Sequence, residues 1–426
     1  MNHANPNTKP TVLFVDMNSF FASCEQQVNY WLRERPVAVC VYTGRNGCVI
    51  SPSIEAKRRG VRVGMRLDDA IKVCPDLVPL ETNPARYRDF HIKIMEVLKT
   101  FSADVFPRSI DEAIVDLTHH QLMYPNIVDV GHKVKAAIRR DVGDWLRCSI
   151  GVAPNAFLAK LASGLQKPDG LVCIDPENID RILSTLRLTD LPGIGSAMAA
   201  RLQAGGIDSP LHLRQASPEK LRQVVRSVVG LHWHYRLNFG GEMDLTTPLN
   251  YKSMQAMRSL SAEQRQTVED VHTLFMKLCF SLEKRLVTQS LFCKAITFSA
   301  RYTTSLRYEV EVRSSLPIQD GAEIHRLLLE RIKKAEHGQP PKQILSIYLS
   351  RLHVGVYDFV PAEMVQYTLF ENNTRRDLLR KAYYDIKTRF GNEAIMRVSE
   401  LKTELLLKDV IGFGSIGDLR KKQGEE

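Results

Sequence analysis

Two apolar segments that carry acidic residues at one end constrain this chain more than any other feature of its sequence. TVLFVDM (11–17) is a nearly continuous apolar run, which predicts a buried strand with Asp16 near its end. DEAIVDLT (111–118) predicts a second strand that begins with Asp111 and Glu112. A carboxylate beside a buried strand loses hydration and needs a partner. We therefore predict that these three acids serve chemistry and not only structure.

The same region alternates between short apolar runs and segments of helical periodicity. Further strands are predicted at 36–42, 47–51 and 147–153, and helices at 19–30, 54–60, 84–102, 128–143 and 155–166. Such alternation is typical of an α/β layer, and we expect helices to cover one face of its sheet.

The rest of the chain divides into segments of different character. Glycine-punctuated helical patterns occupy 176–243, and the next few residues (244–252) have little periodicity, which indicates a linker. Residues 253–358 show the order strand, long helix, two strands, helix, strand, which predicts a compact α+β domain. A polar, flexible arm (1–10) precedes the first strand, and a tail (359–426) follows the last. We expect an α+β multidomain protein, since 426 residues exceed one ordinary core.

The excess of basic residues indicates a polyanionic partner. Lys and Arg number 58 against 48 Asp and Glu, a formal net charge of +10, which favours nucleic acid before a membrane. The eight cysteines form no CxxC pair and no zinc-like spacing with His, so we expect free thiols in a reducing cytoplasm. No apolar run approaches the roughly 20 residues that span a bilayer.

Asp16, Asp111 and Glu112 are suited to hold divalent metal ions. Phosphoryl transfer onto a 3′-hydroxyl uses two such ions about 4 Å apart, one on the nucleophile and one on the triphosphate. Mg²⁺ prefers oxygen ligands, so carboxylates from neighbouring strands fit this chemistry. The alternative for any single acid is a turn cap or an ion pair with a surface arginine. Three acids in such contexts favour the metal site.

Longer motifs around these acids resemble those of one enzyme family. DMNSFFASCE (16–25) and SIDEA (109–113) resemble the two metal-binding motifs of Y-family DNA polymerases of the DinB/UmuC type. The resemblance continues, in the family's order, through VAVCVYTGR (37–45), IEAKRRGVRVGM (54–65), GVAPNAFLAKLASGLQKPDG (151–170) and LPGIG (191–195). It implies a right-hand polymerase with a ferredoxin-like palm (11–175), inserted small fingers (about 31–82), a helical thumb (176–243) and an α+β little finger (253–358).

The resemblance implies an activity as well. Enzymes of this family are template-directed DNA polymerases of low fidelity, which add dNTPs to a primer 3′ end and act in translesion synthesis, DNA repair and the SOS response, as mutator proteins. Two Mg²⁺ would be bound by Asp16, Asp111 and Glu112, with the backbone carbonyl of Met17 as a further ligand. The expected partners are primer–template DNA and dNTPs, and we expect a cytoplasmic monomer without membrane attachment.

Five residues fall at substrate-binding positions of the family. Phe21 takes the steric-gate position, where an aromatic ring collides with a ribose 2′-hydroxyl; core packing is the alternative. Ile50 would roof the templating base pair, with Ser51 at a small-hydroxyl position beside it. Lys57 and Lys160 would bind the triphosphate, although a lone lysine on a helix is usually solvated.

The fingers helix departs from the DinB pattern. DinB-type enzymes usually have Tyr and Arg where this chain has Ile54 and Lys57, and UmuC-type enzymes have a small or apolar residue and Lys there. Lys57 can act on phosphate as a point charge but lacks the bidentate fork of Arg. Because Ile54 has no hydroxyl, Ser51 gains importance, and the bulk of Ile50 leaves the lesion spectrum open.

Two further features suit DNA binding. LPGIGSAMAARL (191–202) has the form of a helix-hairpin-helix, in which Gly193 and Gly195 would let backbone N–H groups meet a DNA phosphate; an ordinary helix–helix turn is the alternative. In the last domain, several basic side chains are expected to form a face against the template backbone. They are Arg258, Lys277, Lys284, Arg285, Lys294, Arg301 and Arg307.

The tail contains a candidate partner site. QYTLF (366–370) resembles the QxxLF peptide by which bacterial polymerases bind the sliding clamp, and Gln366, Leu369 and Phe370 match its specifying positions. A chance match is the alternative for so short a peptide. Its position just beyond the last domain favours a partner site.

Three other functions are alternatives to polymerase activity. A catalytically weak or inactive accessory DNA-binding subunit of the same fold would lack the metal carboxylates, which this chain retains. A nucleotide cyclase uses a similar two-metal palm but needs neither a helix-hairpin-helix nor a clamp peptide. A non-enzymatic DNA-binding module leaves the three acids unexplained. Primer extension with Mg²⁺ and dNTPs separates these functions from polymerase activity.

Overall fold

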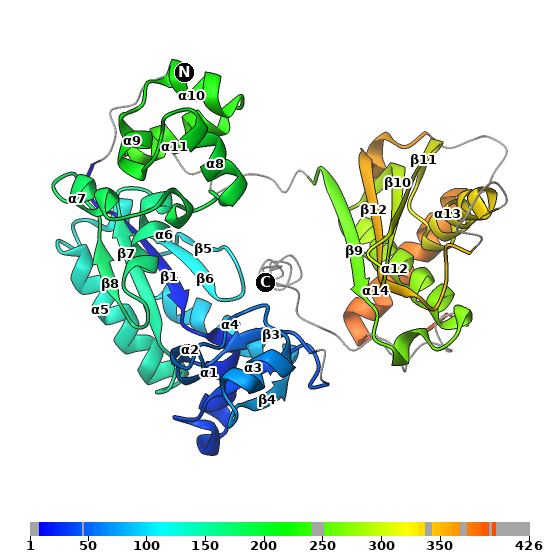
Figure 1. The fold of residues 1–426 in the computed structure, drawn as a ribbon, viewed down its shortest axis with the longest axis horizontal. Helices are drawn as coiled ribbons and strands as arrows, with labels where there is room; N and C mark the ends of the chain where they lie inside the picture. Colours follow the sequence, from blue (N-terminus) through cyan, green and yellow to red (C-terminus); the bar gives the residue numbers. More distant parts are fainter. Residues whose placement is uncertain are drawn as a thin grey trace. The chain divides into compact units, whose positions relative to one another are not determined.

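The chain forms two compact units in the computed structural model, which describes residues 8–44, 47–240, 251–336, 343–366, 373–391 and 394–397. Unit 1 holds Met1–Thr246 and unit 2 holds Thr247–Lys408 (Figure 1). The division falls inside the expected linker 244–252, most of which lies outside the described residues.

Unit 1 contains a five-stranded sheet in the order β5-β6-β1-β7-β8. Its strands are β1 (Val12–Met17), β5 (Val105–Pro107), β6 (Glu112–Asp116), β7 (Cys148–Ala153) and β8 (Leu171–Cys173). β1 is central and pairs antiparallel with β6 on one side and β7 on the other. The strands predicted at 11–17, 111–118 and 147–153 are therefore confirmed, and β8 is a short addition at the edge.

Helices cover both faces of this sheet, so the prediction of one covered face is wrong. α1 (Phe20–Val28), α4 (Pro84–Lys99) and α5 (Ile127–Ala137) share a core with Leu13 and Val15. α6 (Ala156–Leu165) shares a second core with Val12 and Phe14. The alternation of side chains along β1 explains the correction, because all four of these strand residues are buried and neither face of the strand meets water.

A second, three-stranded sheet lies between β1 and α4 in the sequence. Its central strand β2 (Val37–Cys40) pairs antiparallel with β3 (Val49–Pro52) and parallel with β4 (Val78–Glu81). α2 (Ile54–Arg58) and α3 (Leu67–Val73) add Ala56 and Leu67 to its small separate core. These elements fall within the range expected for inserted fingers.

Five short helices complete the described part of unit 1. They are α7 (Ile179–Ser184), α8 (Ser196–Ala204), α9 (Pro210–Gln215), α10 (Pro218–Val225) and α11 (Val229–Leu237). Leu202, Leu213 and Trp233 join the core that contains α6. The Asn155 side chain, at the start of α6, donates to the Arg236 carbonyl at 2.9 Å. The helical segment is thereby packed against the five-stranded sheet's α6 side.

Unit 2 has the predicted order of strand, helix, two strands, helix and strand. The antiparallel sheet β11-β10-β12-β9 is formed by β9 (Ser253–Ser259), β10 (Leu291–Tyr302), β11 (Arg307–Ile318) and β12 (Leu349–Pro361). α12 (Val268–Thr288) and α13 (Gly321–Glu336) share its hydrophobic core and cover one face.

The last helix of unit 2, α14 (Asn373–Phe390), is held on α12 and α13 by buried charges. Glu283 on α12 is fully buried and pairs with Arg397 and Arg380. Arg380 also pairs with Asp320 at 2.7 Å. Breaking one partner of such a buried set leaves a charge uncompensated, so the set fixes α14 on α12.

The cysteines and the apolar helices bear on two expectations from composition, namely free thiols and the absence of a bilayer-spanning segment. All eight cysteines are free, and six of them are buried. Among the helices that the structure describes, none is long and apolar enough to cross a bilayer.

Candidate active site

The pairing of β1 with β6 brings the three predicted acids together. In the antiparallel register Asp16 lies opposite Glu112. The Asp111 carbonyl accepts a hydrogen bond of 2.9 Å from the Met17 amide. The positions of all three acids thus follow from backbone pairing, before any side chain is considered. Met17, whose carbonyl was predicted as a metal ligand, follows Asp16 in β1 and is hydrogen-bonded to Asp111 through its amide.

Two of the three acids lie where burial disfavours the charged form. Burial raises the pKa of Asp16 and the pKa of Asp111. The neighbouring carboxylates raise both pKa values further, because like charges repel. The ammonium of Lys167 opposes this effect at Asp16, and the hydroxyl that Ser109 donates opposes it at Asp111. A site of this kind stabilises cations placed between its carboxylates.

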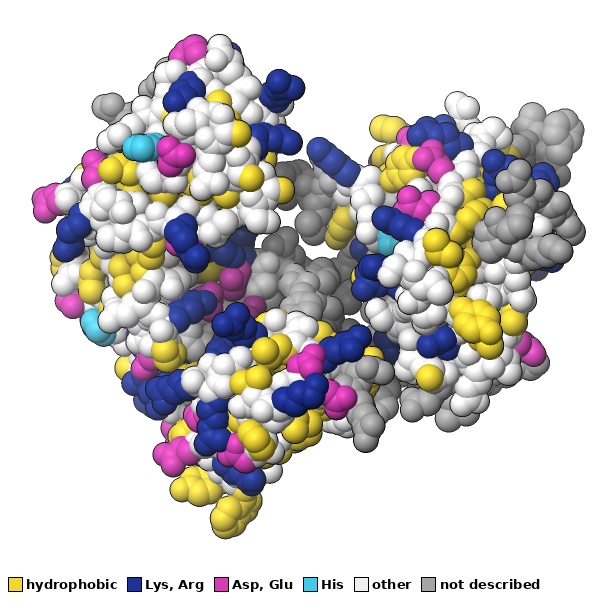
Figure 2. All heavy atoms as spheres, viewed as in Figure 1, with side chains coloured by type: hydrophobic (Ala, Val, Ile, Leu, Met, Phe, Trp, Pro, Cys, Tyr) yellow, Lys and Arg dark blue, Asp and Glu magenta, His cyan; other side chains and the backbone are white. Residues whose placement is uncertain are grey.

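Two lysines pair with the acids in this structure. Lys160 Nζ lies 2.8 Å from Glu112 Oε2, and Lys167 Nζ lies 2.6 Å from Asp16 Oδ2. Both lysine side chains are 42% exposed, whereas Asp16 and Glu112 are 14% and 20% exposed. On the face of unit 1 drawn in Figure 2, acidic side chains lie directly beside Lys and Arg side chains. Each ammonium therefore covers a carboxylate from its solvent side.

The residue types fit Mg²⁺, but the present side-chain positions do not form its ligand set. Within the described ranges, no group of three Asp, Glu, His or Cys side chains is placed to hold a metal ion. The ion pairs give the reason, since Asp16 and Glu112 are turned to ammonium groups. Their hard oxygen donors on a fixed backbone suit Mg²⁺ once the lysines release them.

Lys57 on α2 and the β3 residues Ser51 and Ile50 are the substrate-binding residues predicted in the range of the second sheet. Burial lowers the pKa of Lys57, and the charge of Lys167 lowers it further, while Asp16 and Asp111 raise it. Lys57 therefore belongs to the same electrostatic cluster. Ser51 is buried and accepts a hydrogen bond of 3.4 Å from the Ala22 amide on α1, a contact that ties the fingers to the palm without any ligand. Ile50 is 6% exposed and packs in the core that holds Phe21.

Phe21 is held by an aromatic stack. Its ring lies 4.4 Å from the Tyr87 ring, at an interplanar angle of 16°. The Tyr87 hydroxyl donates to Glu25 Oε1 at 2.9 Å, and Glu25 also pairs with Arg86. Phe21 is 8% exposed, so it is part of the core. Its rotamer is thus fixed by contacts from α4.

Sequence reasoning missed two residues of this site. The sequence showed Tyr87 only as one position of the helix predicted at 84–102. Its ring stacks on Phe21, which lies 66 positions earlier, and no local pattern predicts such a contact. Lys167 belongs to the motif GVAPNAFLAKLASGLQKPDG (151–170), but a lysine just after a helix is usually exposed to solvent and was not singled out. Helical spacing from Lys160 gave no signal for Lys167, because α6 ends at Leu165 and Lys167 lies in the turn that follows.

The predicted phosphate-binding turn precedes α8. Gly193 has φ +85°, a conformation that favours glycine, and Gly195 is the N-cap of α8. No side chain caps the first turn of this helix, and a Cβ at Gly195 would meet open space. Ile194 between the glycines is buried in the core. The turn therefore presents helix N–H groups without side-chain obstruction.

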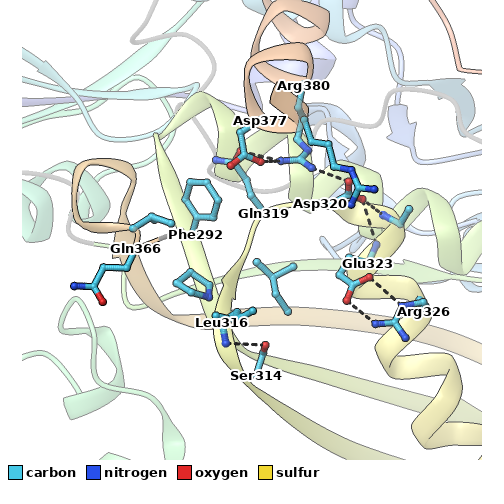
Figure 3. A pocket seen from close by; sticks show the side chains of 15 residues that line it. Phe292, Ser314, Leu316, Gln319, Asp320, Glu323, Arg326, Gln366, Asp377 and Arg380 are labelled. Atoms are coloured by element: carbon cyan, nitrogen blue, oxygen red, sulfur yellow. Dashed lines mark hydrogen bonds and ion pairs between the residues drawn. The ribbon is translucent and has the colours of Figure 1, made fainter. Parts of the chain in front are cut away.

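Of the predicted clamp-binding residues, the structure describes Gln366 alone; Leu369 and Phe370 lie outside the described residues. Gln366 lines a pocket of about 500 Å³ in unit 2, together with Phe292, Leu316 and Arg380. Figure 3 shows Gln366 on one side of this pocket and Arg380 bonded to Asp320 and Asp377 on another. The peptide thus starts where β12 has ended, beside the buried charges that fix α14.

The basic residues of unit 2 do not share one face, which corrects the prediction. Arg301 and Arg307 line a hollow of about 880 Å³ on the sheet, with Arg351 and His353. Lys277 and Lys284 lie on α12, which covers the opposite face, and Arg285 on the same helix donates to the Gln255 carbonyl of the edge strand β9 at 2.7 Å. The reason is that the sheet separates the strand residues from the helix residues.

Comparison with known proteins agrees with this arrangement. Residues 15–164 match the impB/mucB/samB family, and residues 251–369 match the C-terminal domain of that family. A protein named DNA polymerase IV from Pelotomaculum thermopropionicum is 28% identical over 404 residues, which cover 93% of this chain and 97% of that protein. DNA polymerase IV from Staphylococcus aureus (strain JH9) is 37% identical over 202 residues, which cover 47% of this chain and 56% of that protein.

A solved structure has the same fold. It is a Y-family DNA polymerase chimera, Dbh-Dpo4(243-245)-Dbh, with a TM-score of 0.67 at 24% identity, and the alignment covers 82% of this chain and 99% of that chain. The predicted right-hand fold class is thereby confirmed. With both parts of the family matched in order along one chain, this protein belongs to the Y-family of DNA polymerases, DinB type.

Proposed function

We propose that this polymerase adds dNTPs to a primer 3′ end by a two-metal mechanism and copies past damaged template bases. The observation that carries the proposal is the register that sets Asp16 opposite Glu112 with Asp111 adjacent. The ligands would be Asp16, Asp111, Glu112 and the Met17 carbonyl, and two Mg²⁺ would activate the 3′-hydroxyl and neutralise the triphosphate.

Lysines around the acids would bind the rest of the nucleotide. Lys160 Nζ lies 2.8 Å from Glu112 Oε2. The negative charges of Asp16 and Asp111 act to raise the pKa of Lys57, so this ammonium interacts with the same acids. A triphosphate held by the carboxylate-bound metals would lie within reach of these ammonium groups, which bind phosphate as point charges. Ile50 would contact the templating pair and Ser51 would hold the adjoining strand to α1.

Phe21 would select the sugar. Its ring is fixed by the stack on Tyr87, so it cannot rotate freely away from a ribose 2′-hydroxyl. A fixed ring discriminates by a clash, which penalises a ribonucleotide without weakening a deoxyribonucleotide.

The small size of the fingers supports the proposal of low fidelity and lesion bypass. Their core is separate and small, so they offer few groups to enclose the nascent pair. The turn at Gly193 and Gly195 would hold the DNA backbone without reading sequence. Such an activity serves damage tolerance in the cytoplasm of a bacterial cell, including the SOS response, and recruitment would run through 366–370 to a sliding clamp.

The first prediction tests the metal ligands. Asp111→Asn keeps the side chain's size and removes its charge, so Mg²⁺-dependent primer extension should fall roughly a thousandfold, about 4 kcal/mol of lost charge stabilisation. Binding to primer–template DNA should be unchanged, as measured by fluorescence anisotropy.

Asp89→Asn is the matched control, since Asp89 is an exposed acid paired with Lys93 on α4. It should extend primers at the wild-type rate. Wild-type extension by Asp111→Asn would show that the acids are not metal ligands.

The second prediction tests the steric gate. Phe21→Ala removes the ring, so the ratio of ribonucleotide to deoxyribonucleotide incorporation should rise by about tenfold or more, while dNTP use changes little. Single-nucleotide incorporation with matched rNTP and dNTP measures the ratio.

Phe20→Leu is the control, because Phe20 is also buried and its ring centroid lies 5.8 Å from that of Phe21. It should lower the melting temperature and leave the sugar ratio unchanged. A constant ratio in Phe21→Ala would make Phe21 a core residue and nothing more.

The third prediction tests the clamp peptide. Replacing Leu369 and Phe370 with Ala removes the two apolar anchors, each worth about 1.5–3 kcal/mol when buried in a partner's pocket. Clamp binding and clamp-stimulated synthesis should be lost, while extension of a short primer without the clamp stays the same. A pull-down with the clamp and a calorimetric scan measure both effects.

Leu378→Ala with Leu379→Ala is the control, since both leucines are exposed on α14 outside the peptide. That variant should keep clamp binding. If the 369/370 variant instead keeps its clamp affinity and melts at a lower temperature, the two side chains pack on their own protein.

A further inference from the structure

We propose that Gln26 is a positioning residue, which holds the fingers helix α2 against the palm and thereby fixes the place of Lys57. The inference rests on the proposed function, in which Lys57 binds the incoming triphosphate, and adds the group that keeps this lysine in place. Its starting observation is that the buried Gln26 side chain bonds to the palm through one end of its amide and to the fingers through the other.

The amide oxygen of Gln26 faces the palm. It accepts a hydrogen bond of 3.1 Å from Nε1 of Trp145, in the segment between α5 and β7. An indole N–H can only donate, so the partner that it meets must be the oxygen of the amide. The orientation of the Gln26 amide is therefore determined, and its NH2 group points to the fingers.

That NH2 group meets three acceptors at the start of the fingers. The amide nitrogen of Gln26 lies 3.1 Å from the Leu32 carbonyl and 3.3 Å from the Arg35 carbonyl. It also lies 3.2 Å from Glu55 Oε2. Leu32 and Arg35 precede β2, whereas Glu55 lies on α2. One side chain of α1 thus joins the chain that enters the fingers to the helix that carries Lys57.

The Arg35 carbonyl is where this contact meets the N-terminus of α2. It accepts from Gln26 and also from the Ser53 hydroxyl, at 3.3 Å in both cases. Ser53 is the fully buried N-cap of α2, and its hydroxyl accepts from the Val37 and Ala56 amides. A helix of five residues has too few bonds of its own to keep its place in water. These contacts therefore decide where α2 lies.

Lys57 takes its position from the helix that Gln26 holds. It follows Glu55 by two residues on α2. The charges of Asp16 and Asp111 act to raise the pKa of Lys57, so its ammonium interacts with acids of the palm although its backbone belongs to the fingers. Because such interactions fall with distance, a tilt of α2 would change the charge that Lys57 presents at the metal site.

The same helix α1 carries the proposed sugar gate. Phe21 precedes Gln26 by five residues on α1. A second contact between α1 and the fingers runs from the Ala22 amide to Ser51 Oγ and measures 3.4 Å, which is long for an N–H···O bond. Gln26 therefore contributes more to the alignment of Lys57, at the phosphates, with Phe21, at the sugar.

The coupling between Gln26 and Lys57 separates a positioning role from a merely structural one. If Gln26 acts through Lys57, its removal cannot cost more than removal of the lysine, and it costs nothing further once the lysine is gone. A glutamine that only stabilises the fold would weaken nucleotide binding by the same factor with or without Lys57. A double-mutant cycle measures this difference, since independent sites add and coupled sites do not.

The test uses the full chain bound to a primer that ends in a dideoxynucleotide, with Ca²⁺ present, and measures dNTP affinity by fluorescence titration. Lys57→Met should weaken dNTP binding about tenfold, the loss of one charge-assisted hydrogen bond to phosphate. Gln26→Met should weaken it about fivefold on its own and less than about twofold in the Lys57→Met background. Glu55→Met removes one acceptor of the same amide, so it should show the same coupling with a smaller loss.

Gln27→Met is the matched control. Gln27 neighbours Gln26 on α1, and its Oε1 accepts from the Trp145 amide at 2.7 Å, a bond within the palm. This variant should melt at a lower temperature and keep the wild-type dNTP affinity.

Equal losses from Gln26→Met with and without Lys57 would overturn the inference, as would wild-type dNTP affinity in the folded variant. If Gln26→Met does not fold, the same comparison with Glu55→Met decides. Wild-type dNTP affinity in Lys57→Met would refute the proposed role of that lysine, and the inference with it. Wild-type protein that fails to extend an unblocked primer would refute the proposed function itself, so the failures are distinguishable.

Discussion

The antiparallel pairing of β1 with β6 is the constraint on which the rest of this structure depends. It sets Asp16 opposite Glu112 and links Met17 to Asp111 through the backbone. Because side chains alternate along a strand, a shift of one residue would turn these acids to the other face of the sheet. The two faces of β1 pack in different cores, so a one-residue slip would force Leu13 and Phe14 into packing that fits the other side chain.

Gathering acids at a buried strand end creates repulsion that the molecule must offset. Burial and mutual repulsion raise the pKa of Asp16 and of Asp111, and Lys160 and Lys167 supply the opposing charge at Glu112 and Asp16. Removing one member of such a cluster leaves an uncompensated charge. The same balance prepares the site for function, because groups that neutralise carboxylates can also neutralise phosphates.

Local patterns were enough to predict β1, β2, β3, β6 and β7, the acids of β1 and β6, and the order of elements in unit 2, whereas the short strands β4 and β8 were missed. Contacts between distant segments were not predicted. The stack of Tyr87 on Phe21 and the approach of Lys167 to Asp16 join residues 66 and 151 positions apart. The second covered face of the sheet was also missed, because a fully apolar strand such as β1 does not reveal how many layers bury it. The prediction of a single basic face failed because residue type does not reveal that α12 covers the side of the sheet opposite Arg301 and Arg307.

The most direct test is to locate the metals in crystals of the ternary complex with a dideoxy-terminated primer, template, dNTP and Mn²⁺. The account predicts two anomalous-scattering peaks about 3.5–4 Å apart, bound by Asp16, Asp111 and Glu112, with both lysines moved off the carboxylates. A complex that holds nucleotide and DNA but shows no Mn²⁺ peak between these three acids would contradict it.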